Sequence, residues 1–145
     1  MSVSKIMPLF SHHHLRSLLK RHLVRAGTGS DIAQKVADNL VESSLKGHDS
    51  HGVTLLPRYI RAILAGDLNP GATLTTLSDA GSIVSFDGGH GFGQALGEQA
   101  MSVGIERVRQ FGVAIIGLSN THHLGRIGAM GRAGGERRAG LDPFC

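Results

Sequence analysis

The sequence KGHDSHGV, residues 46–53, separates segments that have the apolar spacing of α-helices. Apolar residues recur every three or four positions across residues 11–25 and 30–46, which predicts two helices before this stretch. A third helix is predicted over residues 53–65, because Pro57 is tolerated only in the first turn of a helix. Helices on both sides make the intervening loop a good place to fix proton-transfer groups.

The loop carries two imidazoles, a carboxylate and a hydroxyl at consecutive positions, from His48 to His51. Histidine titrates near neutral pH, so His51 is a candidate to give and take a proton. Ser50 is assigned a binding or orienting role, because neighbouring side chains usually diverge and a nucleophile needs a bond to its base. Pro57 places His51 at or just before a helix N-terminus, where backbone N–H groups favour a bound anion and disfavour a charged imidazole. An equally weighted alternative is structural: His48 and Asp49 close the turn, and His51 caps the helix.

The second half of the chain has the pattern of a βαβ unit. Residues 73–78 alternate weakly, as an edge strand would, and residues 82–86 form a short strand candidate. A helix then runs to about residue 110, and the continuous apolar run 113–118 is typical of a buried parallel strand. The fold class is therefore predicted to be α/β.

The expected organisation is an N-terminal helical segment, residues 1–70, followed by residues 71–145 as the beginning of an α/β domain. The turn Asn-Pro-Gly at residues 69–71 marks the boundary. Glycines within residues 91–97 are similar to a dinucleotide fingerprint, but no acidic residue ends the next strand, which disfavours a standard Rossmann motif. One βαβ unit is too small for a stable sheet, so the sequence is expected to stop within a fold.

A second histidine cluster, His122 and His123, follows the last predicted strand. It lies at the carboxyl end of that strand, which is the usual ligand position of an open α/β sheet. We expect the two histidine clusters to meet, with one side chain of this pair facing a site shared with His51 and the other facing solvent. Asn120 and Thr121 either hydrogen-bond a ligand or make the turn.

Metal binding is a competing chemistry for the histidines. Three or four ligands for a metal-dependent hydrolase or lyase are available from side chains spread over the chain: His48, His51, His122 or His123, and Asp87. Their spacing matches no common zinc motif, so no metal ion is assigned. A further alternative is a non-catalytic, degenerate fragment that binds no cofactor.

Composition narrows the expected partners. The formal charge is +4, but aromatic residues make up 4% of the chain and tryptophan is absent, so stacking platforms for nucleic-acid bases are scarce. A mildly positive protein suits an anionic small substrate or a phosphate-bearing cofactor. No apolar run reaches the roughly 18 residues of a membrane span, and no secretory signal is expected. Cys145 is the single cysteine, which excludes an internal disulfide and fits a reducing cytoplasm.

Several motifs, in order along the chain, resemble the malate/L-lactate dehydrogenase family. This family includes sulfolactate, ureidoglycolate and diketogulonate oxidoreductases and is distinct from the Rossmann-type lactate and malate dehydrogenases. The motifs, with x for residues outside the pattern, are GHDSHGV at 47–53, Tyr59, GDLNP at 66–70, DGxxGxGQ at 87–94, GVA at 112–114 and SNxxHxG at 119–125. The resemblance covers about residues 11–134 and implies reversible reduction of a 2-oxo acid with NAD or NADP, a non-Rossmann dinucleotide-binding fold and a homodimer.

The resemblance also implies roles for single residues. His51 matches the histidine described in several members as the proton donor, with Ser50 as its partner. His123 matches a second active-site histidine, which is named as the proton acceptor in other members. The loop after the last strand matches part of the cofactor and substrate wall, and three of its residues are assigned to cofactor binding: Asn120, Thr121 and Gly125.

The chain departs from the family pattern at two points. Many members have an arginine four residues after the first histidine, where this chain has Leu55. Arg58, one helical turn further on, is the candidate substitute for binding the substrate carboxylate, and His48 is assigned to the same substrate site. Intact members are more than twice as long, and a lysine of the nicotinamide-binding part is expected beyond Cys145. The chain is therefore expected to be an N-terminal fragment, truncated or frameshifted, whose own activity is uncertain.

Overall fold

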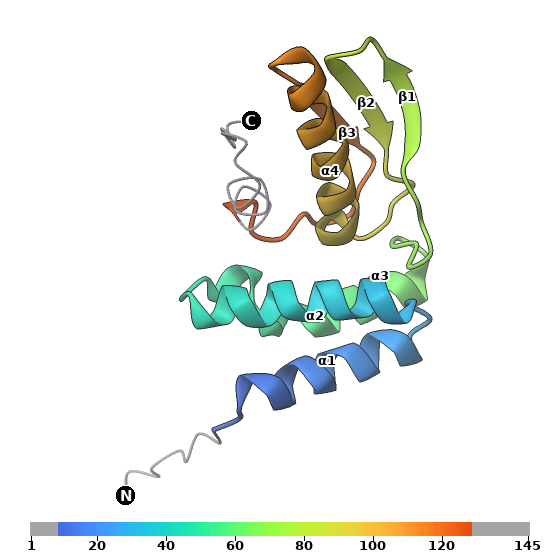
Figure 1. The fold of residues 1–145 in the computed structure, drawn as a ribbon. Helices are drawn as coiled ribbons and strands as arrows, with labels where there is room; N and C mark the ends of the chain where they lie inside the picture. Colours follow the sequence, from blue (N-terminus) through green and yellow to red (C-terminus); the bar gives the residue numbers. More distant parts are fainter. Residues whose placement is uncertain (1–8, 129–145) are drawn as a thin grey trace, which may run out of the picture.

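The computed structural model describes residues 9–128 of the 145-residue chain. In this part, helices come first and a sheet with one more helix follows: α1 His12–Arg25, α2 Ser30–Leu45, two 3₁₀ turns at Asp49–His51 and Val53–Leu55, α3 Leu56–Ala65, β1 Thr75–Asp79, β2 Ile83–Asp87, α4 Gly93–Phe111 and β3 Ile115–Ser119. Helices α1 to α3 gather at one end of the molecule, and the sheet with α4 lies at the other (Figure 1). This mixed arrangement confirms the predicted α/β class.

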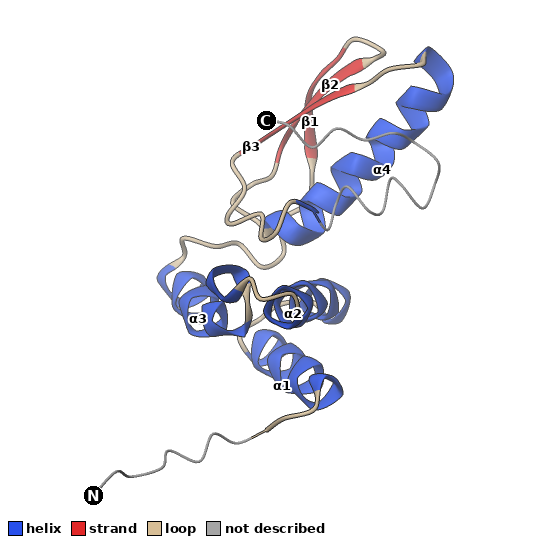
Figure 2. Ribbon diagram, turned by 90° about the vertical axis from the view of Figure 1, so that its left-hand side faces the viewer, coloured by secondary structure: helices blue, strands red, loops and turns tan. Residues whose placement is uncertain are grey.

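The three N-terminal helices lie beside one another, and Figure 2 shows them nearly end-on. Their buried apolar residues form one hydrophobic cluster. α1 starts where the Ser11 hydroxyl accepts a hydrogen bond of 3.2 Å from the His14 backbone N–H. Leu23 of α1 and Leu40 of α2 are fully buried, and burial of each stabilises the fold by roughly 2 kcal/mol. In residues 9–128, no helix is both long and apolar enough to cross a membrane.

The helical core continues into the start of α4. Tyr59 of α3 and Leu68 of the following loop are buried together with Phe92 and Ala95. The turn predicted as a domain boundary near residue 70 lies between α3 and β1, in the segment that links the three N-terminal helices to the sheet. A division of the chain at that residue stays a prediction.

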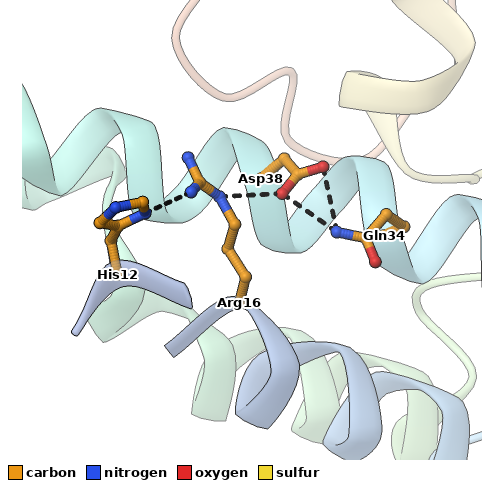
Figure 3. Close-up of polar contacts among 4 residues, drawn as sticks. All are labelled: His12, Arg16, Gln34 and Asp38. Atoms are coloured by element: carbon orange, nitrogen blue, oxygen red, sulfur yellow. Dashed lines mark hydrogen bonds and ion pairs between the residues drawn. The ribbon is translucent and has the colours of Figure 1, made fainter. Parts of the chain in front are cut away.

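A polar network at the surface ties α1 to α2 (Figure 3). The Arg16 guanidinium lies 3.0 Å from a carboxylate oxygen of Asp38, and a second nitrogen of the guanidinium lies 2.6 Å from His12 Nδ1. Gln34 donates to the same carboxylate over 3.1 Å. Partial burial and the neighbouring charges of His13 and Arg16 lower the pKa of His12, in that order. The ion pair is partly exposed, so we expect it to contribute at most about 1 kcal/mol and to set the helix register more than the stability.

The sheet has the order β1-β2-β3, with β2 between an antiparallel and a parallel neighbour. α4 connects the parallel strands, which confirms the predicted βαβ unit. Val84 and Phe86 on one face of β2 are buried against Ala100 of α4. On the other face, Ile83 and its register partner Ile115 remain 50% and 60% exposed. The expectation of a buried last strand is therefore wrong for residues 9–128, because in this part a helix covers only one face of the sheet.

Candidate active site

The loop between α2 and α3 is fixed by contacts with the end of α2. Gly47, with φ of 76°, turns the chain after the helix, and the His48 backbone N–H donates to the Ser43 carbonyl over 2.9 Å. Ser44 Oγ then accepts a hydrogen bond of 3.0 Å from the Val53 N–H. A Cβ at Gly52 would lie only 2.1 Å from this hydroxyl oxygen, so glycine is needed for the loop to lie this close to α2.

His51 lies at the end of a 3₁₀ turn, just before the helical stretch that begins at Val53 as expected, but it does not cap that stretch, because Gly52 occupies the cap position. A second 3₁₀ turn, Val53–Leu55, intervenes, and α3 begins at Leu56 with Pro57 in its first turn. The expected divergence of Ser50 and His51 is wrong. Ser50 Oγ lies 2.9 Å from His51 Nδ1, because the tight turn lets a short side chain reach the ring that follows it.

The loop that follows β3 brings the second histidine cluster to the first. The rings of His51 and His123 stack with their centroids 5.2 Å apart and their planes 29° apart. The loop is held against the start of α4, since the His122 N–H donates to the Gly91 carbonyl over 2.9 Å. A Cβ at Gly93 would lie 2.8 Å from the His123 carbonyl oxygen and 2.7 Å from the Leu124 Cα. The prediction that the two clusters meet is confirmed, and this close approach of backbone to helix is what permits it.

Behind His123 lies a buried hydrogen-bond chain that the sequence analysis did not identify. Tyr59 Oη lies 2.8 Å from His123 Nδ1, and Gln94 Nε2 donates to the same hydroxyl over 2.7 Å. Burial raises the pKa of Tyr59 to about 12, although the hydrogen bond from Gln94 and the charge of Arg58 act in the opposite direction. Both residues belong to the family motifs quoted above. The sequence signal was therefore present, but a tyrosine in an apolar helix stripe gives no indication of its hydrogen-bond partner.

The imidazoles of His122 and His123 are both held toward the neutral form. Burial lowers the pKa of His123, and the charges of His51, Arg58 and His122 lower it further. Burial and Arg58 likewise lower the pKa of His122, while Asp67 opposes them. At neutral pH both rings are therefore uncharged, since the ordinary histidine pKa of about 6.5 is already below 7.

His122 does not face solvent as one member of the pair was expected to do. Its ring lies edge-on to Tyr59, with centroids 5.7 Å apart and planes 81° apart. Its Nδ1 is buried and has no hydrogen-bond partner in the part of the chain that the structure describes. Both histidines contact Tyr59 because the loop that carries them runs along the start of α4, directly over this side chain.

Arg58, the residue assigned to the substrate carboxylate, lies on α3 near enough to the two histidines for its charge to act on them. It is exposed on α3, and its charge acts on Tyr59, His122 and His123. Among residues 9–128 its guanidinium has no hydrogen-bond or ion-pair partner. His48 is exposed at the start of the first 3₁₀ turn, and within the same residues its ring makes no contact with the histidine pair. The substrate roles of Arg58 and of His48 both stay predictions.

The three residues assigned to cofactor binding make contacts within the protein. Asn120, with φ of 50°, donates from its side chain to Asp87, and its carbonyl accepts from the His90 N–H. The Thr121 methyl packs over the backbone of a glycine turn, where a Cβ at position 88 would lie 2.4 Å away. Gly125 is buried, and a Cβ there would lie 2.5 Å from a side-chain oxygen of α2. These contacts shape the loop, and the cofactor role of the three residues stays a prediction.

The ligand set of the metal hypothesis is not assembled. In the described residues, no group of three or more histidine, cysteine or acidic side chains could hold a metal ion. Asp87 instead accepts hydrogen bonds from Asn120 and from the Gly89 N–H, and these bonds lower the pKa of its carboxyl. The carboxylate of Asp87 is therefore engaged in the glycine turn and does not join the histidines as a ligand.

Comparison with known proteins identifies the family to which this sequence and fold are similar. A family model described as malate/L-lactate dehydrogenase matches residues 10–137. Hydroxycarboxylate dehydrogenase B of Escherichia coli (strain K12) is 39% identical over 119 residues, which are 82% of this chain and 33% of that protein. L-lactate dehydrogenase of Cupriavidus necator is 42% identical over 116 residues, 80% of this chain and 33% of that protein. The solved structure of malate dehydrogenase from Pyrococcus horikoshii OT3 superposes with a TM-score of 0.87 at 30% identity, covering 94% of this chain and 39% of that one.

The chain spans about a third of the length of the curated relatives it matches. The match nevertheless covers most of this chain, including both histidine loops and the helices that position them. The chain therefore belongs to the malate/L-lactate dehydrogenase family.

Proposed function

We propose that the chain carries the acid–base and carboxylate-binding side of an NAD- or NADP-dependent oxidoreductase that interconverts a 2-hydroxy acid and its 2-oxo acid. The observation that carries this proposal is the stacked pair of His51 and His123, with ring centroids 5.2 Å apart, near the guanidinium of Arg58, which has no partner within residues 9–128. The named relatives include lactate and malate dehydrogenases, whose substrates have a carboxylate next to the reacting carbon. A cation beside a proton-transfer pair suits such a substrate.

Each side chain has a defined task in this proposal. The Arg58 guanidinium holds the substrate carboxylate by charge-assisted hydrogen bonds. During reduction, an imidazole of the His51–His123 pair gives a proton to the developing alkoxide oxygen, and during oxidation it takes the hydroxyl proton back. The nicotinamide cofactor supplies the hydride chemistry when it is bound, and Asn120, Thr121 and Gly125 are the residues assigned to hold it.

The proposal extends to the assembly and location of the enzyme. The family resemblance supports a homodimer. A cytoplasmic location is supported by the single cysteine, Cys145, because a chain without an internal disulfide suits a reducing compartment.

Binding can be tested on the 145-residue chain itself by NMR titration with pyruvate and with malate. We expect the signals of His51, His123 and Arg58 to shift together. Arg58→Gln should weaken binding about 10- to 100-fold, because a hydrogen bond to a charged group contributes roughly 1.5–3 kcal/mol. The matched control is Arg61→Gln, on the same helix, whose side chain bonds to its own helix backbone. Equal affinity of the Arg58→Gln variant and the unmodified chain would contradict the proposal.

Catalysis can be tested in a chimera, in which this chain replaces the 119 aligned residues of hydroxycarboxylate dehydrogenase B of Escherichia coli. We expect the chimera to reduce a 2-oxo acid with NADH or NADPH. His51→Ala or His123→Ala should then lower kcat/KM by about 10²- to 10⁴-fold, the usual contribution of a general acid or base. The control His12→Ala, in the first turn of α1, should leave kcat/KM unchanged. Full activity of both active-site variants would refute the assignment of the pair.

A further inference from the structure

The hydroxyl of Tyr59 joins two side chains in the interior. It lies 2.7 Å from Gln94 Nε2 and 2.8 Å from His123 Nδ1. Tyr59 is 0% exposed and Gln94 is 5% exposed, so bulk water does not compete for these bonds. We propose that Tyr59 and Gln94 are positioning residues that hold His123 in the tautomer with its proton on Nε2, so that this ring presents an N–H donor to the substrate oxygen.

The assignment follows from a count of protons. The Gln94 amide nitrogen can only donate, so the Tyr59 oxygen accepts from it. The phenol has one proton of its own, and leaving a buried O–H without an acceptor costs about 1–3 kcal/mol. Among the described residues, the available acceptor is His123 Nδ1. A neutral imidazole that accepts at Nδ1 carries its proton on Nε2.

The donor and acceptor roles in this series of hydrogen bonds depend on which end of the Gln94 amide faces Tyr59. With the amide oxygen toward the phenol, Tyr59 would donate to Gln94 and accept from His123 Nδ1–H, leaving Nε2 bare. In the structure the amide nitrogen faces Tyr59, and Oε1 is buried without a hydrogen-bond partner among the described residues, so the orientation rests on the bond from Nε2 to Tyr59. Three groups therefore specify one tautomer, and a change at Gln94 reverses it.

The partner of His51 imposes no such restriction. Ser50 is exposed, and its hydroxyl can either donate to or accept from His51 Nδ1, because solvent satisfies whichever role is left. The contact with Ser50 therefore selects no tautomer of His51, whereas the contact with Tyr59 selects one for His123. This part rests on the proposed function: His123 orients and polarises the substrate oxygen, and His51 is the side chain that gives or takes the proton.

Burial, and then the titratable groups that face His123, favour the neutral form of its ring, in which tautomers are defined. His51 from the first 3₁₀ turn, Arg58 from α3 and His122 from the same loop all act on it, and each disfavours a second proton on the ring. The contacts from α4 come through Gln94, which is uncharged. The neutral ring is thus the resting state at neutral pH.

The test is the tautomer itself, read from ¹⁵N shifts of the ring nitrogens in the histidine-labelled 145-residue chain. The spectra are recorded well above the ordinary histidine pKa of about 6.5. We expect a bare Nδ1 and a protonated Nε2 for His123. In Tyr59→Phe we expect both tautomers of His123 to be populated. The signals of His122 should stay unchanged, because its contact with Tyr59 is to the aromatic ring and not to the hydroxyl. In Gln94→Glu, at a pH where the introduced carboxyl is shown to be ionised by its ¹³C shift, the proton should move to Nδ1.

The matched control is Gln99→Glu, on the exposed face of α4, which should leave the tautomer of His123 unchanged. A protonated Nδ1 in the unmodified chain would overturn the proposal. An unchanged Nε2–H tautomer in a folded Tyr59→Phe chain would also overturn the proposal. This second measurement tests the proposal even if Gln94→Glu fails to fold. No substrate enters this measurement, so loss of pyruvate binding would count against the proposed function and leave the tautomer assignment intact.

Discussion

Replacing Gly93 by alanine tests how the second histidine loop is positioned. Gly93 is the first residue of α4, and its φ lies in the ordinary negative range, so alanine is compatible with the backbone itself. The added Cβ, however, would lie 2.7 Å from Leu124 Cα, 2.8 Å from the His123 carbonyl oxygen and 2.9 Å from the His122 carbonyl oxygen. All three are backbone atoms, so no side-chain rotation can relieve the contact.

The size of the effect can be worked out from these distances. Ordinary contact begins at 3.4 Å, so the loop must move away from α4 by about 0.5–0.7 Å. A shift of that size along the 2.8 Å bond between Tyr59 and His123 would bring it to the limit of a hydrogen bond. Overpacking of this kind costs roughly 1–3 kcal/mol, whereas alanine in place of glycine in a helix gains at most about 1 kcal/mol. We therefore expect a net loss of about 1–2 kcal/mol in the free energy of unfolding.

Urea unfolding followed by circular dichroism measures this loss, and the imidazole NMR signals of His51 and His123 report the displacement of the loop. The control is Gly104→Ala in the same helix, where the Cβ would meet only the side chain of Ile116, at 2.9 Å. It should leave both histidine signals in place. If Gly93→Ala kept the unfolding free energy and the His123 signals of the unmodified chain, the close approach of loop and helix would not be what positions this histidine.

Two further predictions concern pH and the first loop. The pKa values of His122 and His123 are lower in the folded chain than in the unfolded one, so the unfolded chain binds more protons as pH falls below about 6.5. The free energy of unfolding should therefore be highest above that pH and decrease below it. His123→Gln should make this decrease smaller in urea unfolding measured over a series of pH values. An unchanged dependence on pH would contradict the assigned shift. Gly52→Ala should destabilise the chain by roughly 1–3 kcal/mol, because its Cβ would meet Ser44 Oγ at 2.1 Å. Adding Ser44→Ala should recover part of that loss in a double-mutant cycle, and strict additivity of the two changes would rule the contact out.

Local patterns predicted most of the secondary structure because helix and strand periodicity are properties of neighbouring residues. The helices predicted over 11–25 and 30–46 correspond to α1 and α2, and the strand predicted over 82–86 corresponds to β2. Errors arose where a neighbour in space decides the outcome. The apolar run 113–118 has the composition of a buried strand, yet burial of β3 depends on what covers each face of the sheet.

The backbone conformation of the first loop was also outside the reach of sequence patterns. Pro57 correctly limits where α3 can begin, but it does not specify two successive 3₁₀ turns before the helix. Those turns decide whether Ser50 and His51 diverge or bond. The bond between them, 2.9 Å long, therefore follows from dihedral angles that the residue types allow without requiring.

The sequence by itself determined the chemistry on offer: a histidine-rich loop between helices, a second histidine pair after a strand, and a βαβ unit to connect them. Only the tertiary structure decided that His51 and His123 stack, and that Tyr59 and Gln94 lie behind one of them. The physical reason is that contacts between distant segments depend on how closely two backbones can approach. At Gly93 that approach is possible because no Cβ stands between α4 and the loop.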